Sequence, residues 1–198
     1  MSAIHATAVV HPQARLAADV RVGPYSIVDA QVEIGTGCVI GAHVVVTGRT
    51  KIGQNNRIFP FTSIGDEPQD KKYKGEDTGL EIGDGNTIRE FCSLNRGTVQ
   101  DEGMTRVGSA NLLMAYVHVA HDCRIGDNTV FANNTQLGGH VRVGDYAVLG
   151  GFTGVHQFCH VGAHCMTSVG SAVLQDLPPY VLAQGDPAKP HGIKDRKS

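Results

Sequence analysis

Apolar residues recur at every sixth position along most of this chain. The register runs from Ile4 to Ile64, from Ile82 to Leu94 and from Val107 to Val173, and it holds 26 positions. Of these, 25 are apolar, and Thr167 is the exception. A period of six does not match the 3.6-residue period of an α-helix. The pattern therefore predicts short strands joined by corners, with three six-residue units closing a triangular coil of 18 residues.

The residues near each apolar anchor support the same interpretation. Glycine follows the anchor at 12 of the 26 positions, where we expect it to relieve steric strain at a repeated turn. Four residues after the anchor the side chains are mostly small, and all five cysteines stand there: Cys38, Cys92, Cys123, Cys159 and Cys165. We interpret them as core filler rather than as zinc ligands or disulfide partners. Stacked at about 4.8 Å, roughly nine coils would form an all-β prism on the order of 45 Å long.

Composition agrees with a repeat protein of one domain. The chain has 198 residues, 25 glycines, no tryptophan and only 6% aromatic residues, so small residues must fill its core. Hydrophobic residues at 41% and charged residues at 18% argue against disorder, and a net charge of -2 argues against nucleic-acid binding. We expect no membrane span, because no apolar run approaches 18 residues. The start of the chain lacks the features of a secretory signal, so we expect a cytoplasmic location.

Two segments interrupt the repeat and are expected to form loops on the predicted prism. Residues 66–81 hold nine charged side chains, although the 18 residues from Ile64 to Ile82 show no insertion by count. The 13 residues from Leu94 to Val107 are not a multiple of six, so a loop is expected at about 97–106. Such loops on a rigid scaffold often carry function. We predict a β-helix domain over 1–177 and a short C-terminal tail over 178–198.

Histidines gather in the second half of the chain. Six of the ten are His118, His121, His140, His156, His160 and His164. Coils of 18 residues would stack His121, His140 and His156 along one edge of the prism. Three interpretations compete: surface histidines without a role, a zinc site with three ligands and an open position, and acid–base catalysis. The neighbouring Asp122 and Gln157 favour acid–base catalysis with polar substrate contacts, because histidine titrates near neutral pH.

Several segments outside the repeat are similar to those of the UDP-N-acetylglucosamine O-acyltransferases of lipid A biosynthesis. They are PQDKKYKGE (68–76), RGTVQ (96–100), HVAHDC (118–123), GGHVRVGDYAVLGG (138–151), VHQFCHVGAH (155–164) and LPPYVLAQGDPA (177–188). The resemblance covers roughly residues 4–193. It implies a left-handed parallel β-helix of hexapeptide repeats and a homotrimer with active sites between subunits. It also implies transfer of an (R)-3-hydroxyacyl group from acyl carrier protein to the 3-hydroxyl of UDP-N-acetylglucosamine, the first step of lipid A biosynthesis, without a cofactor or a metal.

The resemblance also implies roles for individual residues. His121 would be the general base, Asp122 would orient it, and the Gly139 N–H would bind the oxyanion. Substrate contacts are expected from Gln69, Asp70, Lys72, His118, His140, His156 and Gln157. An acyl-chain groove is expected at Met166, Ser168 and Val169. Expected partners are acyl carrier protein, UDP-N-acetylglucosamine and further copies of the chain.

The chain departs from the family pattern in two places. Asn95 stands where the family usually has histidine, and the chain ends at Ser198, where the family continues into a helical C-terminal domain. Three alternatives are therefore open. The chain is a short paralogue that acylates another nucleotide sugar, a non-catalytic trimeric binding module, or a metal-dependent enzyme.

Overall fold

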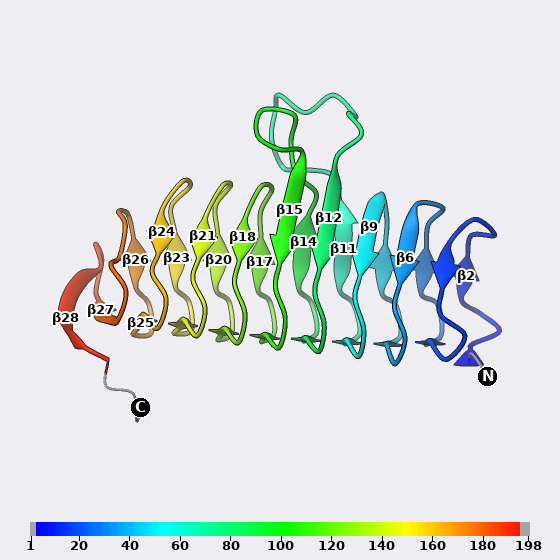
Figure 1. The fold of residues 1–198 in the computed structure, drawn as a ribbon, viewed down its shortest axis with the longest axis horizontal. Coiled ribbons are helices and arrows are strands. Elements are labelled where there is room, and N and C mark those ends of the chain that lie inside the picture. The colour runs from blue at the N-terminus through cyan, green and yellow to red at the C-terminus, as the bar shows by residue number, and fades with distance from the viewer. Residues whose placement is uncertain (1–2, 195–198) are drawn as a thin grey trace.

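The structure, a computed structural model, describes residues 3–194 as a parallel β-helix (Figure 1). Three sheets form the faces of the prism, and up to β26 each sheet takes every third strand of the chain. The termini lie at opposite ends of the long axis (Figure 1). No helix among residues 3–194 is long and apolar enough to cross a membrane. The predicted all-β class and the triangular coil are thus confirmed.

The strands are mostly two residues long. The first sheet contains β1 (Ala3–Ile4), β4 (Arg21–Val22), β7 (Val39–Ile40), β10 (Arg57–Ile58), β13 (Thr87–Ile88), β16 (Leu112–Leu113), β19 (Val130–Phe131), β22 (Val148–Leu149), β25 (Met166–Thr167), β27 (Val181–Gln184) and β28 (Lys189–Ile193). The second contains β2 (Val9–Val10), β5 (Ile27–Val28), β8 (Val45–Val46), β11 (Ser63–Asp66), β14 (Ser93–Asn95), β17 (His118–Val119), β20 (Gln136–Leu137), β23 (Gly154–Val155) and β26 (Ala172–Val173). The third contains β3 (Arg15–Leu16), β6 (Val32–Ile34), β9 (Arg49–Ile52), β12 (Gly79–Ile82), β15 (Met104–Val107), β18 (Arg124–Ile125), β21 (Arg142–Val143) and β24 (His160–Val161).

The apolar anchors form one continuous core inside the prism. Anchors such as Ile64, Leu113 and Leu149 are fully buried and stack on their equivalents in the neighbouring coils. The polar anchor, Thr167, is buried as well, and its hydroxyl accepts the Gly150 N–H at 3.0 Å. That hydrogen bond removes the penalty of placing a hydroxyl in the core.

The cysteines lie inside the prism, as predicted. All five are buried free thiols. Burial raises the pKa of the Cys92 thiol to about 11 and that of Cys123 to about 12. Because the thiolate is the reactive form, these side chains are chemically inert and serve packing.

The glycines that follow the anchors have a different role from the one expected. The corners do use the left-handed backbone conformation, but mostly at non-glycine residues three positions after the anchor, such as Tyr25 and His43. At Gly23 a Cβ would lie 2.6 Å from the backbone of Gly41 in the next coil. The expectation of turn strain was therefore wrong for most of these positions. Close approach of stacked coils is what excludes a side chain there.

The spacing between Ile64 and Ile82 concealed an insertion. Strands in successive coils normally pair residues 18 apart, but β9 and β12 pair Lys51 with Glu81, thirty residues apart. Twelve residues are therefore inserted, and the count suggested none because twelve is a multiple of six. A second insertion separates β12 from β15, where Glu81 pairs with Arg106. Both loops rise from the middle of the prism on the same side (Figure 1).

The C-terminal segment continues the packing of the prism. Strand β27 pairs in parallel with β25, and β28 returns antiparallel to β27. The division into 1–177 and 178–198 stays a prediction, and residues 195–198 of the predicted tail lie outside the described residues.

Core packing predicts a large difference between two phenylalanines. Phe131 is fully buried, whereas Phe152 is 65% exposed. We expect Phe131→Ala to lower the free energy of unfolding by about 3–5 kcal/mol, because it leaves a cavity in the stacked core. The denaturation midpoint in urea measures the loss, and Phe152→Ala is the matched control. Equal losses for the two variants would contradict this account of the core.

Candidate functional site

The histidine edge is the corner at which the chain leaves β17, β20 and β23. Because these strands pair residues 18 apart, His121, Gly139 and Gln157 occupy equivalent positions on three successive coils. The corner backbone is linked between coils: the His140 N–H donates to the His121 carbonyl at 3.0 Å. The Phe158 N–H donates to the Gly139 carbonyl, also at 3.0 Å. Residues far apart in the sequence are thus fixed as neighbours by the main chain.

His121 and Asp122 form a hydrogen-bonded pair. His121 Nδ1 lies 2.9 Å from Asp122 Oδ2, and the Asp122 side chain is almost completely buried. Thr98 donates twice to the same carboxylate, through its backbone N–H at 2.9 Å and its hydroxyl at 2.6 Å. The Asp122 N–H in turn donates to the Thr105 hydroxyl at 2.8 Å. The Thr98 hydroxyl and His121 share Oδ2, and the Thr98 N–H binds Oδ1, so the second loop holds both oxygens of the carboxylate.

These contacts favour the ionised form of Asp122. Burial by itself raises the pKa of Asp122, but the hydrogen bonds from His121 and Thr98 together outweigh it and leave that pKa below its ordinary value. An ionised carboxylate only accepts hydrogen bonds, so Nδ1 of His121 carries the proton. In the neutral imidazole that general-base catalysis requires, Nε2 of His121 is then the nitrogen with the free lone pair.

Gly139 packs directly against the His121 ring. A Cβ at this position would lie 2.5 Å from Cε1 and 2.7 Å from Nε2 of His121. Only glycine therefore permits the ring to rest on the next coil. The Gly139 N–H donates to no backbone carbonyl within residues 3–194, so it is available to a ligand beside the imidazole.

An open groove of about 610 Å³ runs along this edge. Its lining includes Gln69, His118, His121, Gly139, His156 and Gln157. Burial, followed by the proximity of His121, lowers the pKa of His118, so His118 is neutral near pH 7. His118 Nδ1 also lies 2.7 Å from the Ser93 hydroxyl. At the end of the groove nearest the C-terminus, Val155, Ala172 and Leu174 make the lining apolar.

His140 lies behind this groove rather than in its lining. Its ring meets the His121 ring edge-on, at 5.1 Å between centroids and 89° between planes. It also stacks on the Phe158 ring, at 4.5 Å between centroids and 12° between planes. Its Nδ1 lies 3.1 Å from Asp101 Oδ2. His140 is thus held by Asp101 and Phe158 and packs against the His121 ring.

The first loop brings one of its three predicted contacts to the groove. Gln69 lines the groove. The Asp70 carboxylate accepts the Lys72 N–H at 2.9 Å, and neither residue is among the lining residues. Arg96 anchors the loop by donating to the Gly65 carbonyl and, at 2.8 Å, to the Tyr73 hydroxyl.

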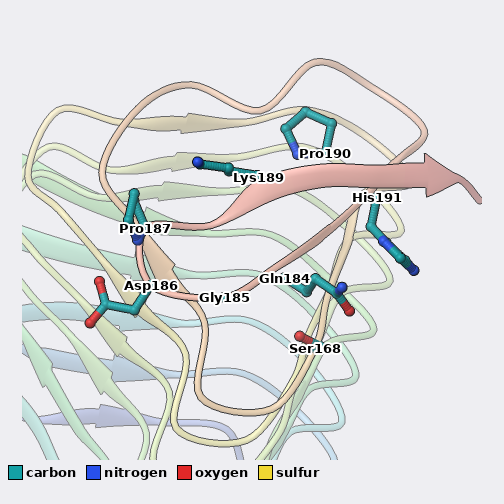
Figure 2. A pocket seen from close by; sticks show the side chains of 8 residues that line it. All are labelled: Ser168, Gln184, Gly185, Asp186, Pro187, Lys189, Pro190 and His191. Carbon is teal, nitrogen blue, oxygen red and sulfur yellow. The ribbon is translucent and has the colours of Figure 1, made fainter.

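The residues predicted for an acyl-chain groove lie near the C-terminal end of the prism. Val169 is 75% exposed and Met166 is 37% exposed. Ser168 lines a separate cavity of about 590 Å³ beneath β28, together with polar residues such as Gln184 and Lys189 (Figure 2). None of the three lines the histidine groove.

His121, Asp122 and His140 also place three potential metal-ligand atoms within 4.8 Å of one another. However, both oxygens of Asp122 already accept hydrogen bonds from Thr98 and His121. This arrangement is typical of a hydrogen-bonded acid–base pair.

Sequence reasoning missed the residues that support the pair. Thr98, Asp101 and Thr105 lie in or beside the inserted second loop, whose register no repeat predicts. The segment RGTVQ stands outside the repeat, but nothing in its sequence shows which side chain faces Asp122. Asn95, the residue that departs from the family pattern, is buried, and its side-chain N–H donates to the Glu67 carbonyl at 2.9 Å.

Comparisons with known proteins agree with this geometry. Residues 13–48 and 104–139 match the model of the bacterial transferase hexapeptide family (six repeats). The acyl-(acyl-carrier-protein)–UDP-N-acetylglucosamine O-acyltransferase of Thiobacillus denitrificans is 62% identical over 195 residues, which are 98% of this chain and 76% of that protein. The protein of the same name from Herminiimonas arsenicoxydans is 58% identical, over 98% of this chain and 74% of its own length.

Solved structures give the same result. LpxA from Acinetobacter baumannii superimposes with a TM-score of 0.94 at 53% identity, covering 96% of this chain and 74% of that one. LpxA from Moraxella catarrhalis superimposes with a TM-score of 0.96 at 47% identity, covering 98% and 76%. With this identity over nearly its whole length, the chain belongs to the acyl-(acyl-carrier-protein)–UDP-N-acetylglucosamine O-acyltransferase family, and its fold is the left-handed parallel β-helix of that family.

Proposed function

We propose that this protein transfers an (R)-3-hydroxyacyl group from acyl carrier protein to the 3-hydroxyl of UDP-N-acetylglucosamine, the first step of lipid A biosynthesis. The observation that carries the proposal is the His121–Asp122 pair, which presents a free Nε2 to the groove beside the Gly139 N–H. Family membership supports the choice of substrates.

The proposed chemistry is acyl transfer by general-base catalysis. His121 Nε2 takes the proton of the sugar 3-hydroxyl while that oxygen attacks the thioester carbonyl carbon. The Gly139 N–H stabilises the oxyanion that forms. The carbon–sulfur bond then breaks, and the thiolate of the carrier protein receives the proton from His121. A general base typically raises the rate about 10²–10⁴-fold, and a hydrogen-bond donor to the oxyanion raises it about 10²–10³-fold.

Substrate contacts follow from the groove lining. His118, His156, Gln157 and Gln69 would contact the sugar, the acyl hydroxyl or the pyrophosphate. The acyl chain would run over the apolar end of the groove towards Val169, with Met166 and Ser168 nearby. Asp70 and Lys72 would contact the substrate from the first loop.

We further propose a homotrimer and a cytoplasmic location. The groove is open along its length, and a neighbouring subunit would close it and bring further contacts to the substrate. Five buried free thiols are compatible with a reducing compartment.

Removing the base tests the proposed mechanism. We expect His121→Ala to reduce transfer by about 10²–10⁴-fold, because no other group in the groove replaces a base held by Asp122. The assay uses (R)-3-hydroxyacyl carrier protein with UDP-N-acetylglucosamine and detects the product by mass. The exposed His11, at the far end of the prism, gives the control His11→Ala. Near-normal turnover in His121→Ala would remove His121 from this role.

Gly139 provides a test of the ring position. We expect Gly139→Ala to lower kcat by about 10–100-fold, since the added methyl group occupies the place of the imidazole ring. Gly151→Ala is the control, because a Cβ there lies no closer than 3.4 Å to its nearest neighbour. Both variants should keep the wild-type circular dichroism spectrum. Unchanged kcat in a folded Gly139→Ala protein would show that the ring does not depend on this contact.

Val169 tests the proposed path of the acyl chain. Val169→Gly shortens a side chain that projects from the last corners of the prism, so we expect preference to shift towards longer acyl donors. Competition between carrier proteins loaded with different chain lengths measures the shift. An unchanged order of preference would place the end of the chain elsewhere.

A further inference from the structure

Asp101, in the second loop, makes two contacts with the prism. Its carboxylate lies 3.1 Å from His140 Nδ1 and accepts a hydrogen bond from Arg124 at 3.1 Å. The adjacent Glu102 contacts Arg124 at 2.9 Å and also pairs with Arg106. Glu102 therefore helps to hold the loop against the prism, whereas Asp101 is the one of these two residues that contacts a histidine.

Three contacts fix the position of the His140 ring. Asp101 lies at Nδ1, Phe158 stacks on the ring, and the ring packs at a right angle against that of His121. Nε2 of His140 lies 3.8 Å from Asp122 Oδ2, which is beyond hydrogen-bond distance. Asp101 is thus the one hydrogen-bond partner of the His140 ring within residues 3–194.

A carboxylate beside Nδ1 determines which nitrogen of an imidazole carries the proton, and it also determines how the ring is oriented. An ionised carboxylate accepts only, so Nδ1 of His140 must carry hydrogen. Turning the ring over would place a carbon atom against Asp101 and lose the bond. With its ring fixed, His140 prevents the His121 ring from swinging away from Gly139.

We propose that Asp101 is a positioning residue for the reaction: it fixes His140, and His140 fixes the base His121 over Gly139. The inference rests on the proposed function for its kinetic consequence. It gives His140 a supporting role in place of the direct substrate contact that was expected, which agrees with its place behind the groove lining.

The first experiment observes the proton on His140 and needs no substrate. Long-range ¹H–¹⁵N spectra of histidine-labelled protein should show protonated Nδ1 for His140 in the wild type. Neither Asp101→Ala nor Asp101→Ser leaves an acceptor within reach of the ring, because the serine side chain is too short. In both variants the proton of His140 should move to Nε2. Asp101→Asn keeps an acceptor oxygen and should keep the wild-type spectrum. Retention of the Nδ1 proton in folded Asp101→Ala and Asp101→Ser would overturn the proposal.

The second experiment separates positioning from substrate binding. We expect Asp101→Ala to lower kcat by about tenfold, with KM for UDP-N-acetylglucosamine within about twofold, and Asp101→Asn to restore most of the rate. Two controls, Glu102→Ala and Arg124→Met, remove loop contacts but leave the Asp101–His140 bond, so they should retain wild-type kcat.

A rise in KM with unchanged kcat would overturn the positioning role and favour direct contact of His140 with substrate. An equal loss of kcat in both control variants would also overturn it, because loop stability would then explain the effect. If the wild-type protein transfers no acyl group while the spectra behave as expected, the proposed function fails and the positioning of His140 by Asp101 stands.

Discussion

The whole structure depends on backbone hydrogen bonds between equivalent positions of successive coils. Each short strand inside the prism pairs in parallel with the strand one coil before it and the strand one coil after it, and only the strands at the ends of the sheets have a single neighbour. A strand of two residues has no stability of its own, so the register is kept only because anchors stack on anchors inside the prism. The same bonds fix the corners, and therefore the side chains that project from them. A rigid edge of this kind aligns the backbone of the histidines, and contacts from the inserted second loop then fix Asp122 and the His140 ring.

Close stacking limits which residues the coils can contain. At Gly23 and at Gly139 a side chain would collide with the next coil, but the two collisions have different consequences. At Gly23 the neighbour is backbone, and glycine preserves the spacing of the coils. At Gly139 the neighbour is the His121 ring, and glycine creates the space in which the proposed base lies. One steric rule of the fold thus also shapes the site.

The His121–Asp122 pair combines a rigid edge with an inserted loop. The corner supplies the histidine, and the loop supplies the Thr98 hydroxyl and N–H that keep the buried Asp122 ionised. Burying a carboxylate is unfavourable unless its oxygens are hydrogen-bonded, and here Thr98 and His121 supply those bonds. The loop that breaks the repeat is therefore part of the site, because the repeat alone offers no donor at that position.

The sequence by itself determined the coil, the core and the edge. A period of six with apolar anchors admits few other folds, and it predicted that His121 and Gly139 are vertical neighbours. It could not reveal the twelve-residue insertion before β12, because that length preserves the count of six. Nor could it show that Thr98 meets Asp122 or that Asp101 meets His140, since these contacts cross from a loop of irregular register to the prism. Periodicity fixes only what repeats, and the tertiary structure alone decided where the chain outside the repeat returns to the edge.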